Sequence, residues 1–102
     1  MGNNFNPFVG DFDDVSDIEG FFREEGALDG ATVLYACYDR GGYDGRAIVI
    51  FERDGQLYEV FGSHCSCHGL EGQWEPGEVT RESLRMYHRE DREWQAFIAS
   101  LE

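Results

Sequence analysis

The stretch that decides the fold runs from residue 31 to residue 61, ATVLYACYDRGGYDGRAIVIFERDGQLYEVF. It contains three segments dense in β-branched and aromatic residues, which favour strands, and we place them near 31–38, 46–53 and 56–61. A Gly-rich connection joins the first two segments, and Asp54-Gly55, a strong hairpin signal, joins the last two. Sequential strands with short connections predict a three-stranded antiparallel meander.

A helix is expected before the meander. Residues 1–15 show no sustained hydrophobic period and are interpreted as an irregular N-terminal arm. Ser16 followed three residues later by Glu19 fits a capping box. An apolar stripe at helical spacing follows, made of Ile18, Phe21 and Phe22. The pattern predicts a helix near residues 17–25, with its end close to Gly26.

A second helix is expected after the meander, near residues 81–101, with Thr80 as its N-cap. On a helical wheel one side is apolar, and it contains Leu84, Tyr87, Trp94, Phe97, Ile98 and Leu101. The opposite side is a basic outer stripe, formed by Arg81, Arg85, Arg89 and Arg92. Glu90 and Asp91 fall on or near the apolar side, so a break in the helix there is consistent with the pattern.

These elements predict an α+β fold in the order α-β-β-β-α. We expect a three-stranded antiparallel meander flanked by an N-terminal and a C-terminal helix, with both helices on one face of the sheet. The length of 102 residues matches one domain, spanning residues 1–102.

The charge balance is strongly acidic. The chain has 21 acidic and 8 basic residues, all of them Arg, and a formal net charge of -13. Residues 1–30 hold eight acids against Arg23 alone, which gives -7. Such a field repels phosphates and anionic membranes, so we expect no direct contact with nucleic acid or membrane. It either keeps the protein in solution or attracts a basic partner, through candidate contact residues Asp11, Asp13, Asp14, Asp17, Glu24 and Glu25.

The compartment is expected to be the cytoplasm. No apolar run approaches the roughly 20 residues that a membrane span needs. The first ten residues lack the basic and apolar segments of a secretory signal. Three cysteines are an odd number and do not form a complete disulfide framework, which favours reduced thiols.

The loop of residues 62–77, GSHCSCHGLEGQWEPG, carries four possible metal ligands: His64, Cys65, Cys67 and His68. Thiolates and imidazoles are zinc ligands, but structural zinc sites draw on two separated pairs, and this crowding instead favours a packed loop without a cofactor. Either Cys65 or Cys67, next to a histidine, is also a candidate nucleophile. Since neighbours in sequence seldom supply catalytic geometry, we do not expect an enzyme.

Trp74 stands in the same loop, between Glu71 and Glu75. The favoured interpretation is that Trp74 closes one end of the core. The alternative is that the indole, with the two acids beside it, is an aromatic anchor for a partner.

Residues 62–76, GSHCSCHGLEGQWEP, resemble a block found in small proteins of tailed bacteriophages. In that family a similar His-Cys-Ser-Cys, Gly-Leu-Glu-Gly-Gln-Trp and Pro series follows a short strand and precedes a helix. The resemblance implies a phage origin and the cytoplasm of the host cell, and it brings no activity with it.

Small acidic phage proteins without catalytic signatures are similar to inhibitors of host defence, such as anti-CRISPR proteins and DNA mimics. The leading functional prediction is therefore a binding protein that occupies a basic surface on a host nucleic-acid-binding complex and inhibits it. The alternative is a small zinc-binding or structural phage protein built around the His64-Cys65-Cys67-His68 loop. An enzyme ranks third.

Overall fold

The structure, a computed structural model, describes residues 7–39, 45–64, 69–87, 89 and 92–101 of the chain. In chain order its elements are β1 (Phe8–Gly10), α1 (Val15–Phe22), β2 (Thr32–Asp39), β3 (Gly45–Arg53), β4 (Gln56–His64), β5 (Gly77–Val79), α2 (Arg81–Arg85) and α3 (Arg92–Ser100).

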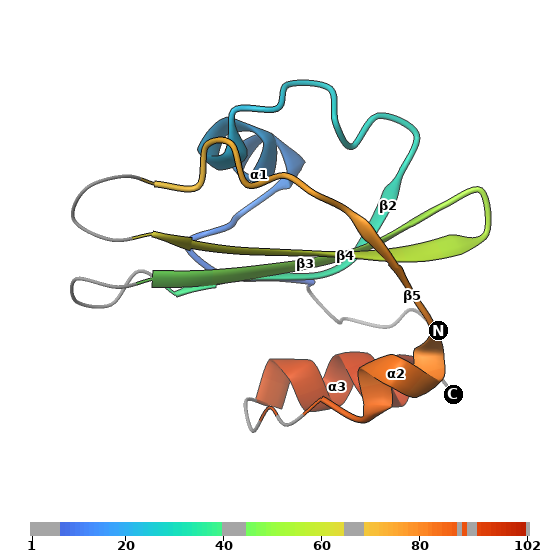
Figure 1. The fold of residues 1–102 in the computed structure, drawn as a ribbon. Helices are drawn as coiled ribbons and strands as arrows, with labels where there is room; N and C mark the ends of the chain where they lie inside the picture. The colour runs from blue at the N-terminus through green and yellow to red at the C-terminus, as the bar shows by residue number, and fades with distance from the viewer. Residues whose placement is uncertain (1–6, 40–44, 65–68, 88, 90–91, 102) are drawn as a thin grey trace.

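The strands form one mixed sheet in the order β1-β2-β3-β4-β5 (Figure 1). The β1 strand runs parallel to β2, and all other neighbouring pairs are antiparallel. The predicted three-stranded sheet with two helices is therefore wrong. The three predicted strands form the centre, β2 to β4, and a short strand lies on each side of them.

Both missed strands are three residues long, too short to show a period of two in the sequence. The β1 strand belongs to the stretch expected to be irregular. It is joined to β2 through a hydrogen bond of 2.8 Å from the backbone N–H of Ala36 to the carbonyl of Pro7. The β5 strand pairs with the first half of β4, from Leu57 to Glu59. Tertiary pairing, rather than local propensity, makes these two segments strands.

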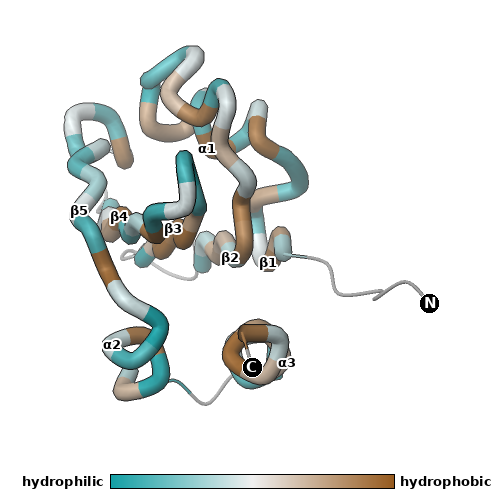
Figure 2. The backbone as a smooth tube through the Cα atoms, turned by 90° about the vertical axis from the view of Figure 1, so that its right-hand side faces the viewer, coloured by the Kyte–Doolittle hydropathy of each residue, from teal (hydrophilic) through white to brown (hydrophobic). Residues whose placement is uncertain are grey.

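Helices cover both faces of the sheet, so the expectation that they share one face is wrong as well. The α1 helix lies on one side, and α2 and α3 lie on the other (Figures 1 and 2). The sequence of β3 contains the reason, because residues 47–51, AIVIF, are all buried. A continuous apolar run is typical of a strand that is covered on both faces.

Each face has its own hydrophobic cluster. The cluster under α1 contains Phe12, Ile18, Phe22, Leu28, Ala36, Tyr38, Ala47, Val49, Phe51, Val60 and Leu70. The cluster under α2 and α3 contains Tyr35, Ile48, Ile50, Leu57, Val79, Leu84, Trp94 and Phe97. Alternate residues of β2, β3 and β4 supply the two clusters, as the pleat of a strand requires.

The α1 helix begins earlier than the capping box at Ser16 predicts. Its N-cap is Asp14, whose carboxylate accepts a hydrogen bond of 2.9 Å from the backbone N–H of Asp17. The carboxylate of Asp17 in turn accepts one of 2.9 Å from the N–H of Asp13. The helix ends at Phe22, and its C-cap, Arg23, adopts a left-handed conformation with φ 58°. An aspartate two residues upstream thus replaces the predicted cap.

The predicted helix at 81–101 consists of two helices. Thr80 is confirmed as an N-cap, and its hydroxyl accepts a hydrogen bond of 3.1 Å from the N–H of Ser83. The α2 helix ends at Arg85, and α3 begins at Arg92. The Asp54-Gly55 hairpin is also confirmed, with φ of 54° and 81° at the two positions, as a type I′ turn requires.

Within the described ranges, no helix is both long and apolar enough to cross a membrane.

Candidate functional site

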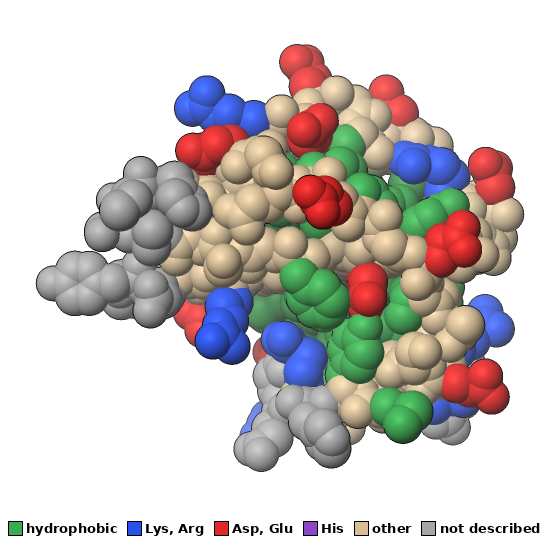
Figure 3. Space-filling view, viewed as in Figure 1, with side chains coloured by type: hydrophobic (Ala, Val, Ile, Leu, Met, Phe, Trp, Pro, Cys, Tyr) green, Lys and Arg blue, Asp and Glu red, His purple; other side chains and the backbone are tan. Residues whose placement is uncertain are grey.

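The predicted partner-binding acids lie in the layer that contains α1. We call six of them the acidic face: Asp11, Asp13, Asp14, Asp17, Glu24 and Glu25. Asp17 is half-buried and the other five are exposed. Four of the acids precede α1 or lie in its first turn, and two follow its end. Figure 3 shows acidic side chains over this upper part of the molecule.

The acids at the start of α1 have a structural role. Asp14 and Asp17 accept backbone hydrogen bonds there, and negative charge at a helix N-terminus is favourable because the helix dipole is positive at that end. The stability of α1 therefore accounts for much of the acidity near residues 11–17.

The acids at the other end of α1 have the opposite effect. Glu24 and Glu25 follow the C-cap of the helix, Arg23, at the end where the dipole is negative and cations are preferred. The last turn of α1 contains no basic residue, and both glutamates are exposed. The C-cap, Arg23, supplies one positive charge beside these two negative ones. Helix stability does not explain their position.

Trp74 packs on the core under α1. Its ring lies 5.1 Å from the ring of Phe22 in an edge-on arrangement, and 5.8 Å from the ring of Phe51 in a stacked one. The indole is half-buried, so it closes the core at this point. Glu71 and Glu75 on either side of it are exposed, and the role of these three residues in partner binding stays a prediction.

His64 belongs to β4 and lies on the α1 side of the sheet. Its Nδ1 atom is 3.1 Å from the hydroxyl of Tyr38, and the two rings meet edge-on with centroids 5.7 Å apart. The opposing residue on β3 is Gly45, and a Cβ at that position would overlap the imidazole. The absence of a side chain at Gly45 thus makes room for the His64 ring.

The other predicted metal ligands, Cys65, Cys67 and His68, lie outside the described residues. Among residues 7–39, 45–64, 69–87, 89 and 92–101, no group of three or more His, Cys, Asp or Glu residues is placed to hold a metal ion. The zinc alternative and the cysteine-nucleophile alternative stay predictions.

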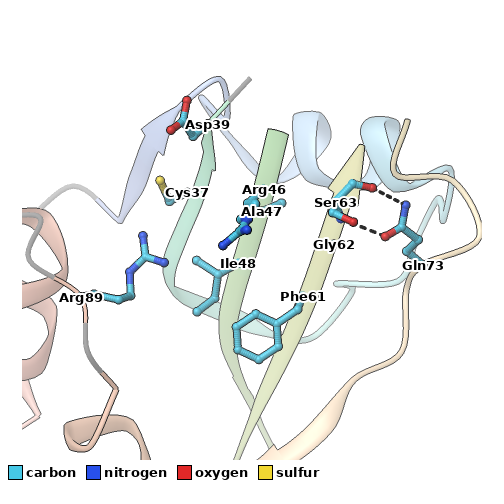
Figure 4. A pocket seen from close by; sticks show the side chains of 10 residues that line it. All are labelled: Cys37, Asp39, Arg46, Ala47, Ile48, Phe61, Gly62, Ser63, Gln73 and Arg89. Carbon is cyan, nitrogen blue, oxygen red and sulfur yellow. Dashed lines mark hydrogen bonds between the residues drawn. The ribbon is translucent and has the colours of Figure 1, made fainter. Parts of the chain in front are cut away.

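The opposite face of the sheet holds a cavity of about 470 Å³ that the sequence did not reveal (Figure 4). It lies where β2, β3 and β4 approach the connection between α2 and α3. The rim contains the thiol of Cys37 and the carboxylate of Asp39, and Ile48 forms an apolar floor. Arg46 and Arg89 supply two guanidinium groups, and Phe61 lies opposite Arg89.

Arg89 does not belong to a solvated outer stripe, as the helical wheel predicts. It lies between the two helices and is half-buried. Its guanidinium carbon is 5.8 Å from the centre of the Tyr35 ring and 5.4 Å from that of Trp94. Two cation–π contacts therefore hold the charge at the cavity wall.

Arg46 reaches the same cavity from β3. It stands opposite Asp39 on β2 and opposite Ser63 on β4, so the register of the meander brings these polar residues together. In the sequence Asp39 and Arg46 are separated by a glycine-rich connection, and only the strand register places them side by side. The sequence signal for this proximity is that an acid and a base flank the glycine-rich connection.

Tyr87 connects the cavity to the helical layer. Its hydroxyl donates a hydrogen bond to the carboxylate of Glu59, and its ring lies 6.1 Å from the ring of Phe61. Burial raises the pKa of Tyr87 above its usual value, and the hydrogen bond and negative charge of Glu59 act in the same direction. Tyr87 therefore remains a neutral hydrogen-bond donor at physiological pH.

Gln73 closes the far side of the cavity. Its side-chain amide accepts a hydrogen bond of 2.9 Å from the N–H of Ser63 and donates one of 2.7 Å to the carbonyl of the same residue (Figure 4). It also donates one of 2.8 Å to the carbonyl of Gly69. A single side chain thus fixes the loop against the end of β4.

Comparison with protein-family models, curated proteins and solved structures gave no match.

Proposed function

We propose that the chain is a phage-encoded inhibitor that acts by binding. In this proposal the acidic face engages the basic surface with which a host protein complex holds nucleic acid. The carboxylates stand in for phosphates, as they do in DNA mimics and some anti-CRISPR proteins, and the host complex loses access to its own substrate.

The observation that carries the proposal is the position of Glu24 and Glu25. Both are exposed at the negative end of the α1 dipole, where each costs the isolated protein a few tenths of a kcal/mol. Acids at a position that opposes stability favour an external role. The net charge of -13 adds a long-range field that attracts a basic partner.

The α1 layer suits such a contact because it is rigidly attached. Glu19 accepts a hydrogen bond of 2.9 Å from the N–H of Leu28, which fixes the turn that follows the helix. Arg53 donates one of 2.6 Å to the carbonyl of Ala27 from the β3 side. Glu24 and Glu25 therefore sit on a segment held at both ends, so little conformational entropy is lost on binding.

The test compares two variants of equal charge. The first removes four acids from the acidic face: Asp11→Asn, Asp13→Asn, Glu24→Gln and Glu25→Gln. The control removes four exposed acids elsewhere: Asp54→Asn, Glu78→Gln, Glu82→Gln and Glu93→Gln. Each variant changes the formal charge from -13 to -9, and both leave the caps at Asp14 and Asp17 in place.

Each protein is used as bait in a lysate of host cells, and association with the captured protein is then followed by surface plasmon resonance with and without competing DNA. We expect the first variant to associate about tenfold more slowly or worse, the control to stay near wild type, and DNA to compete with binding. Equal effects of the two variants, or capture that DNA does not displace, would refute the proposal.

A further inference from the structure

The cavity between the sheet and the connection of α2 to α3 lies on the face opposite α1, and the proposed inhibitor role leaves it unused. At about 470 Å³ it falls within the range of small-molecule sites, roughly 300–1,000 Å³. Its position makes it independent of the acidic face. Figure 3 shows arginine side chains and exposed hydrophobic side chains together where the sheet meets the lower helices.

Arginine side chains are prominent in the described lining of the cavity. Among the described residues, the lining contains two guanidinium groups, from Arg46 and Arg89, and one carboxylate, that of Asp39. These two arginines line one cavity in a protein that has only 8 basic residues and a net charge of -13. A guanidinium stays charged at all physiological pH values and presents a planar fork of donors that fits phosphate or carboxylate oxygens. The two guanidinium groups are therefore suitable donors for an anionic group.

Phe61 gives the cavity an exposed aromatic surface. Its side chain is 54% exposed, a large apolar area to leave in water, while its inner side rests near Tyr87. Tyr87 in turn stacks on Trp94 with ring planes 2° apart and centroids 5.7 Å apart. A row of aromatic rings thus backs Phe61 and ends at the cavity. Exposed rings of this kind accept planar groups by stacking, as they do with nucleobases.

Polar side chains around the floor of the cavity can form hydrogen bonds with a ligand. The carboxylate of Asp39 accepts hydrogen bonds from hydroxyl or amino groups, and the hydroxyl of Ser63 both donates and accepts. Ile48 provides an apolar surface between them. The cavity therefore combines an anion site, a planar stacking surface and acceptors for hydroxyl or amino groups.

We infer that this cavity binds a nucleoside monophosphate. The phosphate lies between Arg46 and Arg89, the base stacks on Phe61, and the sugar hydroxyls or the base amino group donate to Asp39. A free mononucleotide brings about two negative charges at most, whereas a nucleic acid strand would bring its charges against the acidic remainder of the surface. The ligand is accordingly a small molecule and not a polymer.

The experiment is isothermal titration of the full chain with AMP, GMP, CMP and UMP in turn. Adenosine tests the base without the phosphate, inorganic phosphate tests the anion alone, and indole-3-acetate tests a planar carboxylate. We expect at least one nucleotide to bind saturably, and about tenfold or more tightly than adenosine or phosphate alone.

Two variants locate the site. Arg46→Gln removes an exposed cavity arginine, and its matched control, Arg85→Gln, removes an exposed arginine of α2 outside the cavity. Both change the net charge by the same amount. Arg46→Gln should weaken nucleotide binding about tenfold and Arg85→Gln should leave it unchanged. Phe61→Ala should weaken binding of the nucleotide but not of inorganic phosphate.

Three results would overturn the inference. The first is no saturable binding of any of the four nucleotides at millimolar concentration. The second is an equal loss in Arg46→Gln and Arg85→Gln, which reduces the effect to net charge. The third is tighter binding of indole-3-acetate than of every nucleotide, which would assign the site to planar carboxylates. Circular dichroism of each variant verifies that the fold is intact.

Discussion

The two faces of the sheet are covered in different ways. On one face the eight residues of α1, together with Leu70 and Trp74, close over an aromatic core, and the outer surface is acidic. On the other face α2 and α3 are separated by a connection, and the end of the sheet beside that connection stays open as the cavity. The charged side chains differ as well, since the described lining of the cavity contains Arg46 and Arg89 beside Asp39. A small domain can thus present two different surfaces with a single sheet between them.

The largest expected effect separates the two tryptophans, one on each face. Trp94 is 1% exposed and contacts Tyr35 and Phe97 at centroid distances of 5.0 and 5.2 Å, whereas Trp74 is only half-buried. Trp94→Ala should lower the free energy of unfolding by about 3–5 kcal/mol, and Trp74→Ala by about 1–2 kcal/mol. Urea denaturation of both variants measures the difference. Equal losses would mean that the two faces contribute alike to stability.

The next effect concerns the acids at the start of α1. Asp14→Ala removes the N-cap and should lower the free energy of unfolding by about 1 kcal/mol. Asp13→Ala is the matched control, because Asp13 takes part through its backbone N–H and its side chain is exposed. It should change stability by less than about 0.5 kcal/mol. If Asp14→Ala left the free energy of unfolding unchanged, the structural role of the acids at the start of α1 would be contradicted.

The third effect is the pH dependence of stability that Tyr87 produces on the α2 and α3 side of the sheet. The pKa of Tyr87 is raised in the folded state, so the unfolded chain loses this proton first as the pH rises. The resulting stabilisation is complete below the unfolded pKa of about 10 and is lost above it. The free energy of unfolding should therefore fall more steeply above about pH 10 in wild type than in Tyr87→Phe. The difference should be modest because the ring is half-exposed. If the free energy of unfolding falls equally steeply with pH in both proteins, Tyr87 is not the source of the pH dependence.

The smallest effect concerns the other end of α1. Replacing Glu24 and Glu25 by Gln should raise the free energy of unfolding by a few tenths of a kcal/mol, because two charges leave the negative end of the helix dipole. Thermal unfolding at low ionic strength, where the dipole term is least screened, is the suitable measurement. Destabilisation would show that these glutamates support the fold, and the argument for an external role would fail.

Local signals predicted the centre of the molecule well. The residues of the three central strands, the Asp54-Gly55 turn and the Thr80 cap were all evident from propensity and turn chemistry. The outer strands β1 and β5 were missed, because segments of three residues become strands only through their neighbours. The continuous apolar run at 47–51 is the sequence signal for a strand covered on both faces, and it favours helices on both sides of the sheet.

The site was less predictable than the fold. The acids near α1 form a visible cluster in the sequence. The bounds of the helix are needed to tell the acids that cap it from those that do not. The cavity depends on the pairing of Asp39 with Arg46 and on a break that directs Arg89 toward the sheet. A helical wheel places Arg89 on the outside because it assumes an unbroken helix. Register and helix breaks are tertiary properties, and they decide where these side chains meet.

The contact between Gln73 and Ser63 has a consequence for the behaviour of the protein at high concentration. Within the described part of the chain, β5 covers only the first half of β4, so the second half would offer its backbone groups to a strand from another copy. The Gln73 amide takes the place of a strand residue at Ser63, and an incoming chain must first displace both of its hydrogen bonds. With outer strands of only three residues on either side, the sheet is protected against the edge-to-edge growth that leads to aggregation.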